Sequence, residues 1–142
     1  MKRIIALAAL LGACSPAAPL APDAAVAGCW QGLNDIGTVT LGWTPDAANV
    51  SQLNGQADTV TSPGGHGMER YSLARDGKGW RLCETSYELP ECFSVVTSGE
   101  AKTHAVITGD GKSLRIAIPT DDGTKLVIDG KRADGGGWLR ES

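Results

Sequence analysis

Short runs in which apolar and polar residues alternate recur along the chain from Gly28 onward. In the clearest run, Leu114, Ile116 and Ile118 alternate with other residues, a spacing that places the three apolar side chains on one face of a strand. None of the runs is long enough for a helix of ordinary length. After a first strand that begins at Gly28, the pattern predicts strands at 38–43, 50–53, 56–61, 68–74, 80–85, 93–97, 104–108, 114–118, 125–128 and 138–140.

Asn-Gly and Asp-Gly pairs separate many of these runs. Asn54-Gly55 is the strongest turn signal, because this pair readily adopts the positive φ angles of a two-residue type I′ hairpin turn. We therefore predict a hairpin that joins 50–53 to 56–61. Further turns are indicated at Asp76-Gly77, Asp110-Gly111, Asp122-Gly123, Asp129-Gly130 and Asp134-Gly135.

About ten short strands joined mainly by tight turns favour an all-β fold. An antiparallel meander of this kind has to hide its edge strands, and it does so by closing into a barrel or by folding into two packed sheets. We predict a closed or nearly closed barrel of about 8 to 10 strands, with a β-sandwich as the alternative.

The first fourteen residues have the organisation of a bacterial export signal. Lys2 and Arg3 precede a short apolar run, which is far below the ~20 residues needed to cross a bilayer. The run ends in Leu11-Gly12-Ala13-Cys14, which resembles the lipobox of bacterial lipoproteins. The resemblance implies that 1–13 are a cleaved signal and that Cys14 carries the lipid that anchors the protein to the cell envelope. The alternative is an ordinary secretory signal. Because Ser15 and not an aspartate follows the cysteine, the resemblance also implies the periplasmic face of the outer membrane.

Residues 14–27 are rich in proline and alanine, a composition that predicts a semi-rigid, poorly helical tether. Residues 28–142 then suffice for one domain with a single core.

The charge of the chain limits the classes of partner that it can bind. The sequence has 13 Lys and Arg against 16 Asp and Glu, and without Lys2 and Arg3 the balance is 11 against 16. The basic residues are scattered apart from Lys131-Arg132, whereas nucleic-acid binding requires a basic face. We therefore expect no nucleic-acid partner.

Three cysteines remain besides Cys14, so one of them stays unpaired in an oxidising compartment. Cys83 and Cys92 flank a short segment, and a hairpin there places them opposite each other. We predict that these two form a disulfide and that Cys29 is free, with pairing through Cys29 as the alternative.

The ends of the domain carry a second resemblance. Gly28 and Trp30 stand in the first strand, and Arg140 stands in the last. Lipocalins and related calycin barrels have a Gly-x-Trp at their first strand, and an arginine near the end of the barrel packs over that tryptophan. The chain is similar to these barrels at Gly28, Trp30 and Arg140, which implies a barrel closed by the same contact.

Catalytic and metal-binding patterns are scarce. His66 and His104 have no other ligand at metal-binding spacing, and no nucleophile has an obvious base. Glu84, Glu88 and Glu91 lie beside the predicted hairpin and are interpreted as a solvated acidic patch. We therefore expect a non-enzyme without a cofactor.

One loop invites a functional interpretation. Gly64, Gly65, His66 and Gly67 leave the backbone open to a partner. The following Arg70-Tyr71 is similar to part of the motif of membrane-bound lysozyme inhibitors, lipoproteins whose loop enters the lysozyme cleft.

The sequence therefore favours a non-catalytic binding module that contacts a periplasmic protein, with inhibition of a hydrolase as one form of that role. The alternatives are a carrier of a small hydrophobic ligand and a structural envelope protein. Because Trp30, Trp43, Trp80 and Trp138 are needed to fill a small core, we expect a filled interior and recognition by loops and surface.

Overall fold

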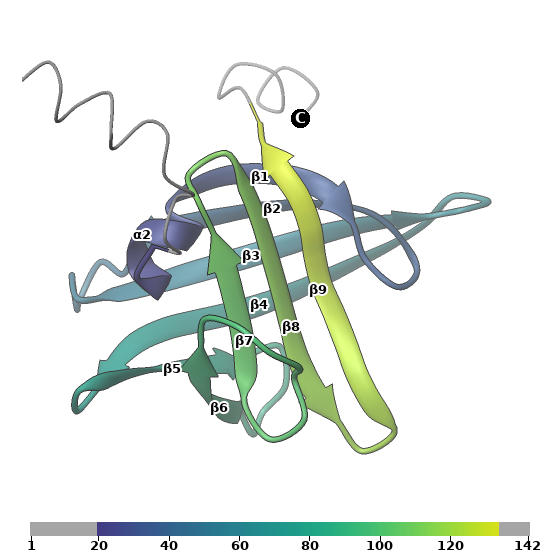
Figure 1. The fold of residues 1–142 in the computed structure, drawn as a ribbon. Helices are drawn as coiled ribbons and strands as arrows, with labels where there is room; N and C mark the ends of the chain where they lie inside the picture. The colour runs from purple at the N-terminus through teal and green to yellow at the C-terminus, as the bar shows by residue number, and fades with distance from the viewer. Residues whose placement is uncertain (1–19, 134–142) are drawn as a thin grey trace, which may run out of the picture.

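The computed structural model describes residues 20–133, which form a short helix and a nine-stranded barrel (Figure 1). The prediction of an all-β barrel is confirmed, and the sandwich alternative is wrong. The elements are α2 (Pro22–Val26), β1 (Gly28–Leu33), β2 (Gly37–Pro45), β3 (Gln52–Thr61), β4 (Gly65–Asp76), β5 (Gly79–Glu84), β6 (Glu91–Val96), β7 (Ala105–Gly109), β8 (Ser113–Thr120) and β9 (Gly123–Arg132).

Strands that follow each other in sequence also pair in the sheet, and β9 pairs with β1 to close it. All these pairs are antiparallel except β6 with β7, which is parallel. The connection 97–104 therefore returns along the outside of the barrel, where Ala101 is buried against Val106 and Ala117. The prediction of a wholly antiparallel sheet is wrong at this one pair.

Glycines allow the first and last strands to approach closely. Gly32 pairs with Gly130, and a Cβ atom on Gly130 would lie 2.3 Å from the backbone oxygen of Gln31. Asp129-Gly130 is therefore part of a strand and not a turn, contrary to the sequence prediction. The predicted turns at Asp76-Gly77, Asp110-Gly111 and Asp122-Gly123 are present, and their glycines have φ of 62°, 93° and 144°. Asp134-Gly135 lies outside the described residues.

The predicted Asn54-Gly55 turn is also wrong, because both residues lie inside β3. Gly55 pairs with Trp43 on one side and with Tyr71 on the other, and an added Cβ atom would lie 2.8 Å from the Trp43 ring. The glycine makes room for an indole inside the barrel. The chain instead reverses after Asp46, whose carboxylate accepts hydrogen bonds from the backbone N–H groups of Ala48 and Asn49.

The interior of the barrel is filled by fully buried side chains, among them Trp30, Leu41, Leu73, Ile107 and Ile116. Trp43 is also buried, and Trp80 packs against this core while partly exposed. Trp138 lies outside the described residues.

One end of the barrel is capped by α2, which corrects the prediction of a tether up to residue 27. Pro22 starts the helix, where its fixed φ and missing N–H cost nothing. Ala25 and Val26 are fully buried, and the Val26 carbonyl oxygen accepts a hydrogen bond of 2.8 Å from Trp30 Nε1. Burial of this face outweighs the weak helical tendency of so short a segment.

An arginine packs over Trp30, as the lipocalin resemblance implies, but it is Arg132. Its guanidinium lies 4.5 Å from the centroid of the indole and donates to the backbone oxygens of Gly111 and Ala27. Gly28 has a φ of 105°, and a Cβ atom there would lie 2.5 Å from Arg132 Nη1. The predicted partner, Arg140, lies outside the described residues.

The disulfide prediction is confirmed. Cys83 in β5 and Cys92 in β6 are directly opposite each other and are bonded, while Cys29 is half-buried and has no disulfide partner within residues 20–133.

Candidate functional site at the mouth of the barrel

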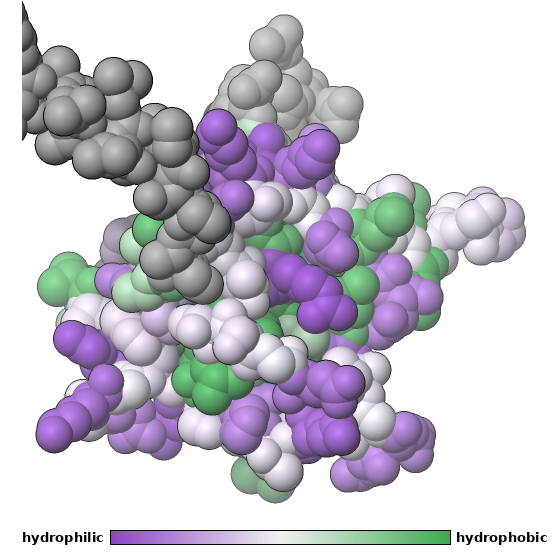
Figure 2. Space-filling view, in the orientation of Figure 1, coloured by the Kyte–Doolittle hydropathy of each residue, from purple (hydrophilic) through white to green (hydrophobic). Residues whose placement is uncertain are grey.

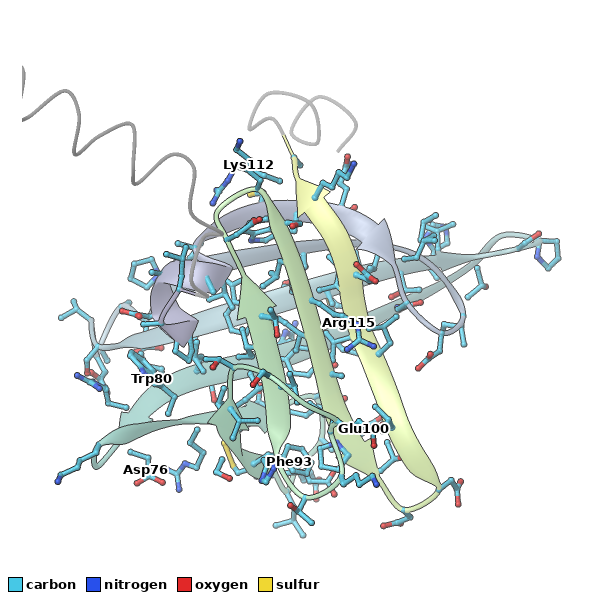
Figure 3. The ribbon with its side chains drawn as sticks, in the orientation of Figure 1. Asp76, Trp80, Phe93, Glu100, Lys112 and Arg115 are labelled. Atoms are coloured by element: carbon cyan, nitrogen blue, oxygen red, sulfur yellow. A yellow bond between two sulfur atoms is a disulfide. The ribbon has the colours of Figure 1, made fainter. Side chains whose placement is uncertain are left out.

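The connections between strands gather at two opposite ends of the barrel. The closed end holds α2 and the β2–β3, β4–β5 and β7–β8 turns, and the Leu20 N–H donates to the Gly109 oxygen there. The other end, which we call the mouth, holds the β1–β2 (34–36), β3–β4 (62–64), β5–β6 (85–90) and β8–β9 (121–122) connections. In Figure 3, Lys112 marks the closed end and Glu100 lies toward the mouth.

Four polar side chains meet inside the barrel just below the mouth. Glu69 and Tyr71 alternate with outward residues on β4, so both point inward. Glu84 is directly opposite Tyr71 on β5, and Lys125 comes from the first residues of β9. Strands that are far apart in the sequence thus bring two carboxylates, one ammonium and one phenol together, and we call these four residues the inner cluster.

The contacts of the inner cluster leave one carboxylate underpaired. Lys125 Nζ donates to Glu69 Oε2, and the Tyr71 hydroxyl donates to Glu69 Oε1 over 3.3 Å. Lys125 Nζ also lies 3.6 Å from Glu84 Oε2, which is buried and has no hydrogen-bond partner among the described residues.

Burial and neighbouring charge shift the pKa of each group in a definite direction. Burial above all, with the neighbouring Glu69, raises the pKa of Glu84 despite the opposing effect of Lys125. Burial lowers the pKa of Lys125, but its hydrogen bonds and charge interactions with Glu69 and Glu84 outweigh that effect and raise it overall. Burial, followed by the charges of Glu69 and Glu84, raises the pKa of Tyr71, so its phenol stays protonated.

A pocket of about 420 Å³ opens above this cluster, and we call it the mouth pocket. Glu69 and Lys125 form its charged floor, and an added Cβ atom at Gly67 would meet open space. Its rim is apolar and exposed at Ile36, Met68 and Tyr87. Figure 2 shows hydrophobic surface on the right of the molecule, beside the β1–β2 connection and the base of the β3–β4 hairpin.

Hydrogen bonds hold the β1–β2 rim segment in place. Asn34 Oδ1 accepts from the backbone N–H groups of Ile36 and Gly37, and its amide donates to Thr59 Oγ1 over 2.9 Å. Asp35 accepts from the Leu126 N–H over 2.7 Å, which ties this connection to β9.

The β5–β6 connection is tied to β4 in a similar way. The Thr85 N–H donates to the Arg70 oxygen, and the Arg70 N–H donates to Ser86 Oγ, each over 2.8 Å. These bonds place Tyr87 at the pocket, so the rim is organised before any partner arrives.

A larger hollow of about 640 Å³ lies on the outer face of β2, β3 and β4. The charged residues of its lining, Asp58 and Arg70, are both exposed, so it lacks a buried ionisable cluster like the one below the mouth. Half of its lining residues are neutral and polar: Thr40, Thr44, Gln52, Asn54, Gln56, Ser72 and Thr85. Cys29, Trp43 and Tyr71 also line it. We therefore take the mouth pocket as the candidate site.

The predicted contact loop is only partly a loop. Gly64 is in the turn, whereas Gly65, His66 and Gly67 belong to β4, where they pair with β3. These residues are exposed on a hairpin that projects beyond its neighbours (Figure 1).

The Arg70-Tyr71 pair divides between two surfaces. Both residues border the outer hollow, but Arg70 is exposed there, whereas Tyr71 is buried and its hydroxyl donates to Glu69 in the inner cluster. The strand alternation therefore separates the two residues that carried the resemblance to lysozyme inhibitors.

The predicted acidic patch is wrong for Glu84. Glu84 is buried inside the barrel, whereas Glu88 and Glu91 are exposed. The alternation of Trp80, Leu82 and Glu84 indicates the inward direction, because Leu82 on the same face belongs to the core. Sequence reasoning missed Glu69, Lys125 and the rim, whose proximity depends on strand pairing. Cys14 lies outside the described residues.

No family model, curated protein or solved structure that was compared with this chain matches it. Among residues 20–133, no helix has the length and apolar character needed to cross a membrane. The same residues contain no group of three or more His, Cys, Asp and Glu side chains arranged to hold a metal ion.

Proposed function

We propose that this protein is a non-catalytic binding module of the cell envelope that recognises a periplasmic protein through the mouth of its barrel. The observation that carries the proposal is the pocket at the mouth, where an exposed apolar rim surrounds a charged floor. Protein-binding surfaces combine apolar anchors of this kind with polar groups that fix orientation.

Exposed apolar side chains concentrate at the mouth. They come from the connections and strand ends there, at Leu33, Ile36, Val60, Met68, Tyr87 and Leu89. Two exposed apolar residues lie at the closed end, Val50 in the β2–β3 turn and Leu20 before α2. Ile36, Met68 and Tyr87 line one pocket, and apolar residues grouped in this way indicate a contact site, whereas single exposed residues do not.

The end of the barrel at which the chain enters supports a partner in the periplasm. The described chain enters the barrel at the closed end, where Leu20 and α2 pack. A lipid on Cys14, only six positions before Leu20 in the sequence, anchors the protein from that end. The mouth then points away from the anchoring membrane.

The interior favours protein recognition over ligand transport. Large side chains fill the barrel below the inner cluster, whereas a carrier of a hydrophobic ligand needs an apolar cavity of several hundred Å³. The carboxylate with the raised pKa, Glu84, is buried under the pocket floor and is not among the pocket-lining residues. Its position supports a binding role rather than proton transfer to a substrate.

Site-specific photo-crosslinking in the cells that make the protein tests this proposal. A photoreactive phenylalanine analogue replaces Met68 or Tyr87 at the mouth, and Val50 serves as the matched exposed position at the closed end. We expect a protein adduct of one size from both mouth positions and none from Val50. Adducts from Val50 alone, or no adduct from either mouth position, would contradict the proposal.

A further inference from the structure

We propose that the mouth pocket binds a cationic group on an apolar stem, namely a lysine or arginine side chain of a partner protein. This inference rests on the proposed function in taking the partner to be a protein. It adds the chemistry of the group that enters the pocket.

The carboxylates in and below the pocket outnumber its one cationic side chain, Lys125, so a second cation would be attracted there. Asp35 and Glu69 line the pocket together with Lys125, and Glu84 lies below them. Lys125 bonds to Glu69 and forms only a longer ion pair with Glu84, whose Oε2 has no hydrogen-bond partner among the described residues. The Glu84 side chain is only 8% exposed, and its Oε2 lies 3.6 Å from the pocket-lining ammonium of Lys125. Because the pocket and the layer below it hold three carboxylates and one lysine, an arriving cation is attracted and an arriving anion is repelled.

The rim fits the stem of a long basic side chain. Lysine and arginine bury their methylene groups on apolar surfaces while their charged ends make polar contacts. Ile36 and Met68 offer such a surface, and the exposed ring of Tyr87 adds a site for cation–π attraction. The volume of about 420 Å³ lies at the small end of ligand pockets, which suits one side chain and its immediate neighbours.

The surface around the mouth pocket is also negatively charged. The four connections at the mouth and the nearby segment 97–104 carry Asp35, Glu88, Glu100, Asp121 and Asp122, with Lys102 as their one lysine or arginine. Lys102 is already paired with Glu100 at 3.3 Å. An acidic surface of this kind steers basic partners toward the pocket and repels an anionic membrane.

The chain offers a convenient reporter for a test with lysine itself. Its two methionines are Met1 and Met68, so methyl labelling of methionine places one NMR signal at the rim of the pocket. The full chain in non-ionic detergent is titrated at pH 7.5 with Nα-acetyl-lysine methylamide. The norleucine analogue keeps the stem without the charge, and the glutamate analogue reverses the charge.

We expect the lysine derivative to shift the Met68 signal saturably, with at least fivefold higher affinity than either analogue. Glu84→Gln should weaken lysine binding at least fivefold. Asp76→Asn, which makes the same change of charge on an exposed residue at the closed end, should change it less than twofold. Equal binding of lysine and norleucine, equal effects of the two variants, or the absence of a saturable shift would each overturn the inference.

The two proposals fail in distinguishable ways. A protein adduct at Met68 or Tyr87 without lysine binding overturns only the chemistry of the ligand. Lysine binding without an adduct at either position overturns the protein partner and retains the cation site.

Discussion

Lys125→Met tests the electrostatic account of the inner cluster. The substitution keeps most of the volume of the stem but removes the cation that bonds to Glu69 and lies 3.6 Å from Glu84 Oε2. Two unit charges at that distance attract by about 5 kcal/mol at an effective dielectric constant of about 20. Because 31% of the Lys125 side chain is exposed, solvent weakens the interaction. We expect a loss of about 3 kcal/mol in the free energy of unfolding at pH 8, comparable to breaking a buried ion pair.

The loss in the free energy of unfolding caused by Lys125→Met should be smaller at acidic pH. In the folded protein the pKa of Glu84 is raised above its unfolded value, so protonation of Glu84 favours folding. This contribution is fully present below the unfolded pKa and is lost as pH rises through the folded pKa. Without Lys125, which lowers the pKa of Glu84, that carboxylate binds a proton more readily, so at pH 4.5 the variant should lie closer to the wild type. Glu84→Gln should restore part of the stability lost at pH 8, because it removes the underpaired charge.

Guanidinium chloride unfolding followed by tryptophan fluorescence measures these differences. Lys131→Met is the matched control on the same strand, because Lys131 is exposed and makes no ion pair in the described structure. Its effect should stay within about 0.5 kcal/mol. An equal loss for Lys125→Met at pH 4.5 and pH 8, or no recovery in the double variant with Glu84→Gln, would refute the reasoning.

Three other substitutions test the scaffold and the anchor. Replacing Cys83 and Cys92 with serine should lower the free energy of unfolding by about 2.6 kcal/mol for a sequence separation of 9, and unchanged denaturant midpoints would contradict this. Arg132→Leu should cost about 2 kcal/mol by removing the contact with Trp30 and two backbone hydrogen bonds, and a calorimetric melting temperature equal to the wild type would speak against it. Cys14→Ser should move the protein from the detergent phase to the aqueous phase, and unchanged partitioning would exclude the lipid anchor.

The fold could be predicted from the sequence where the signal was local. Alternation identified most strands, and three of the Asp-Gly pairs mark hairpin turns. The errors at Gly55 and Gly130 share a physical cause. Each glycine is needed for close approach inside the sheet, to the Trp43 ring or to the backbone of β1, and a sequence pattern does not distinguish that need from a turn.

The site was less predictable because it depends on pairing between distant strands. Glu69 and Lys125 are 56 positions apart, and their contact requires the barrel to close. A register shift between Ile116 and Ala117 also changes the alignment of β8 with β9, which local alternation does not reveal. Glu84 had a usable signal, since Leu82 shares its face, but its negative charge favoured a solvated interpretation.

Sequencing the partner peptide that crosslinks at Tyr87 tests the central claim most directly. The account predicts a segment of a periplasmic protein with a lysine or arginine beside apolar residues. It also predicts that replacing that basic residue with glutamine abolishes the adduct. An acidic segment at the crosslink, or an adduct that persists undiminished after the replacement, would contradict recognition of a cationic side chain at the mouth.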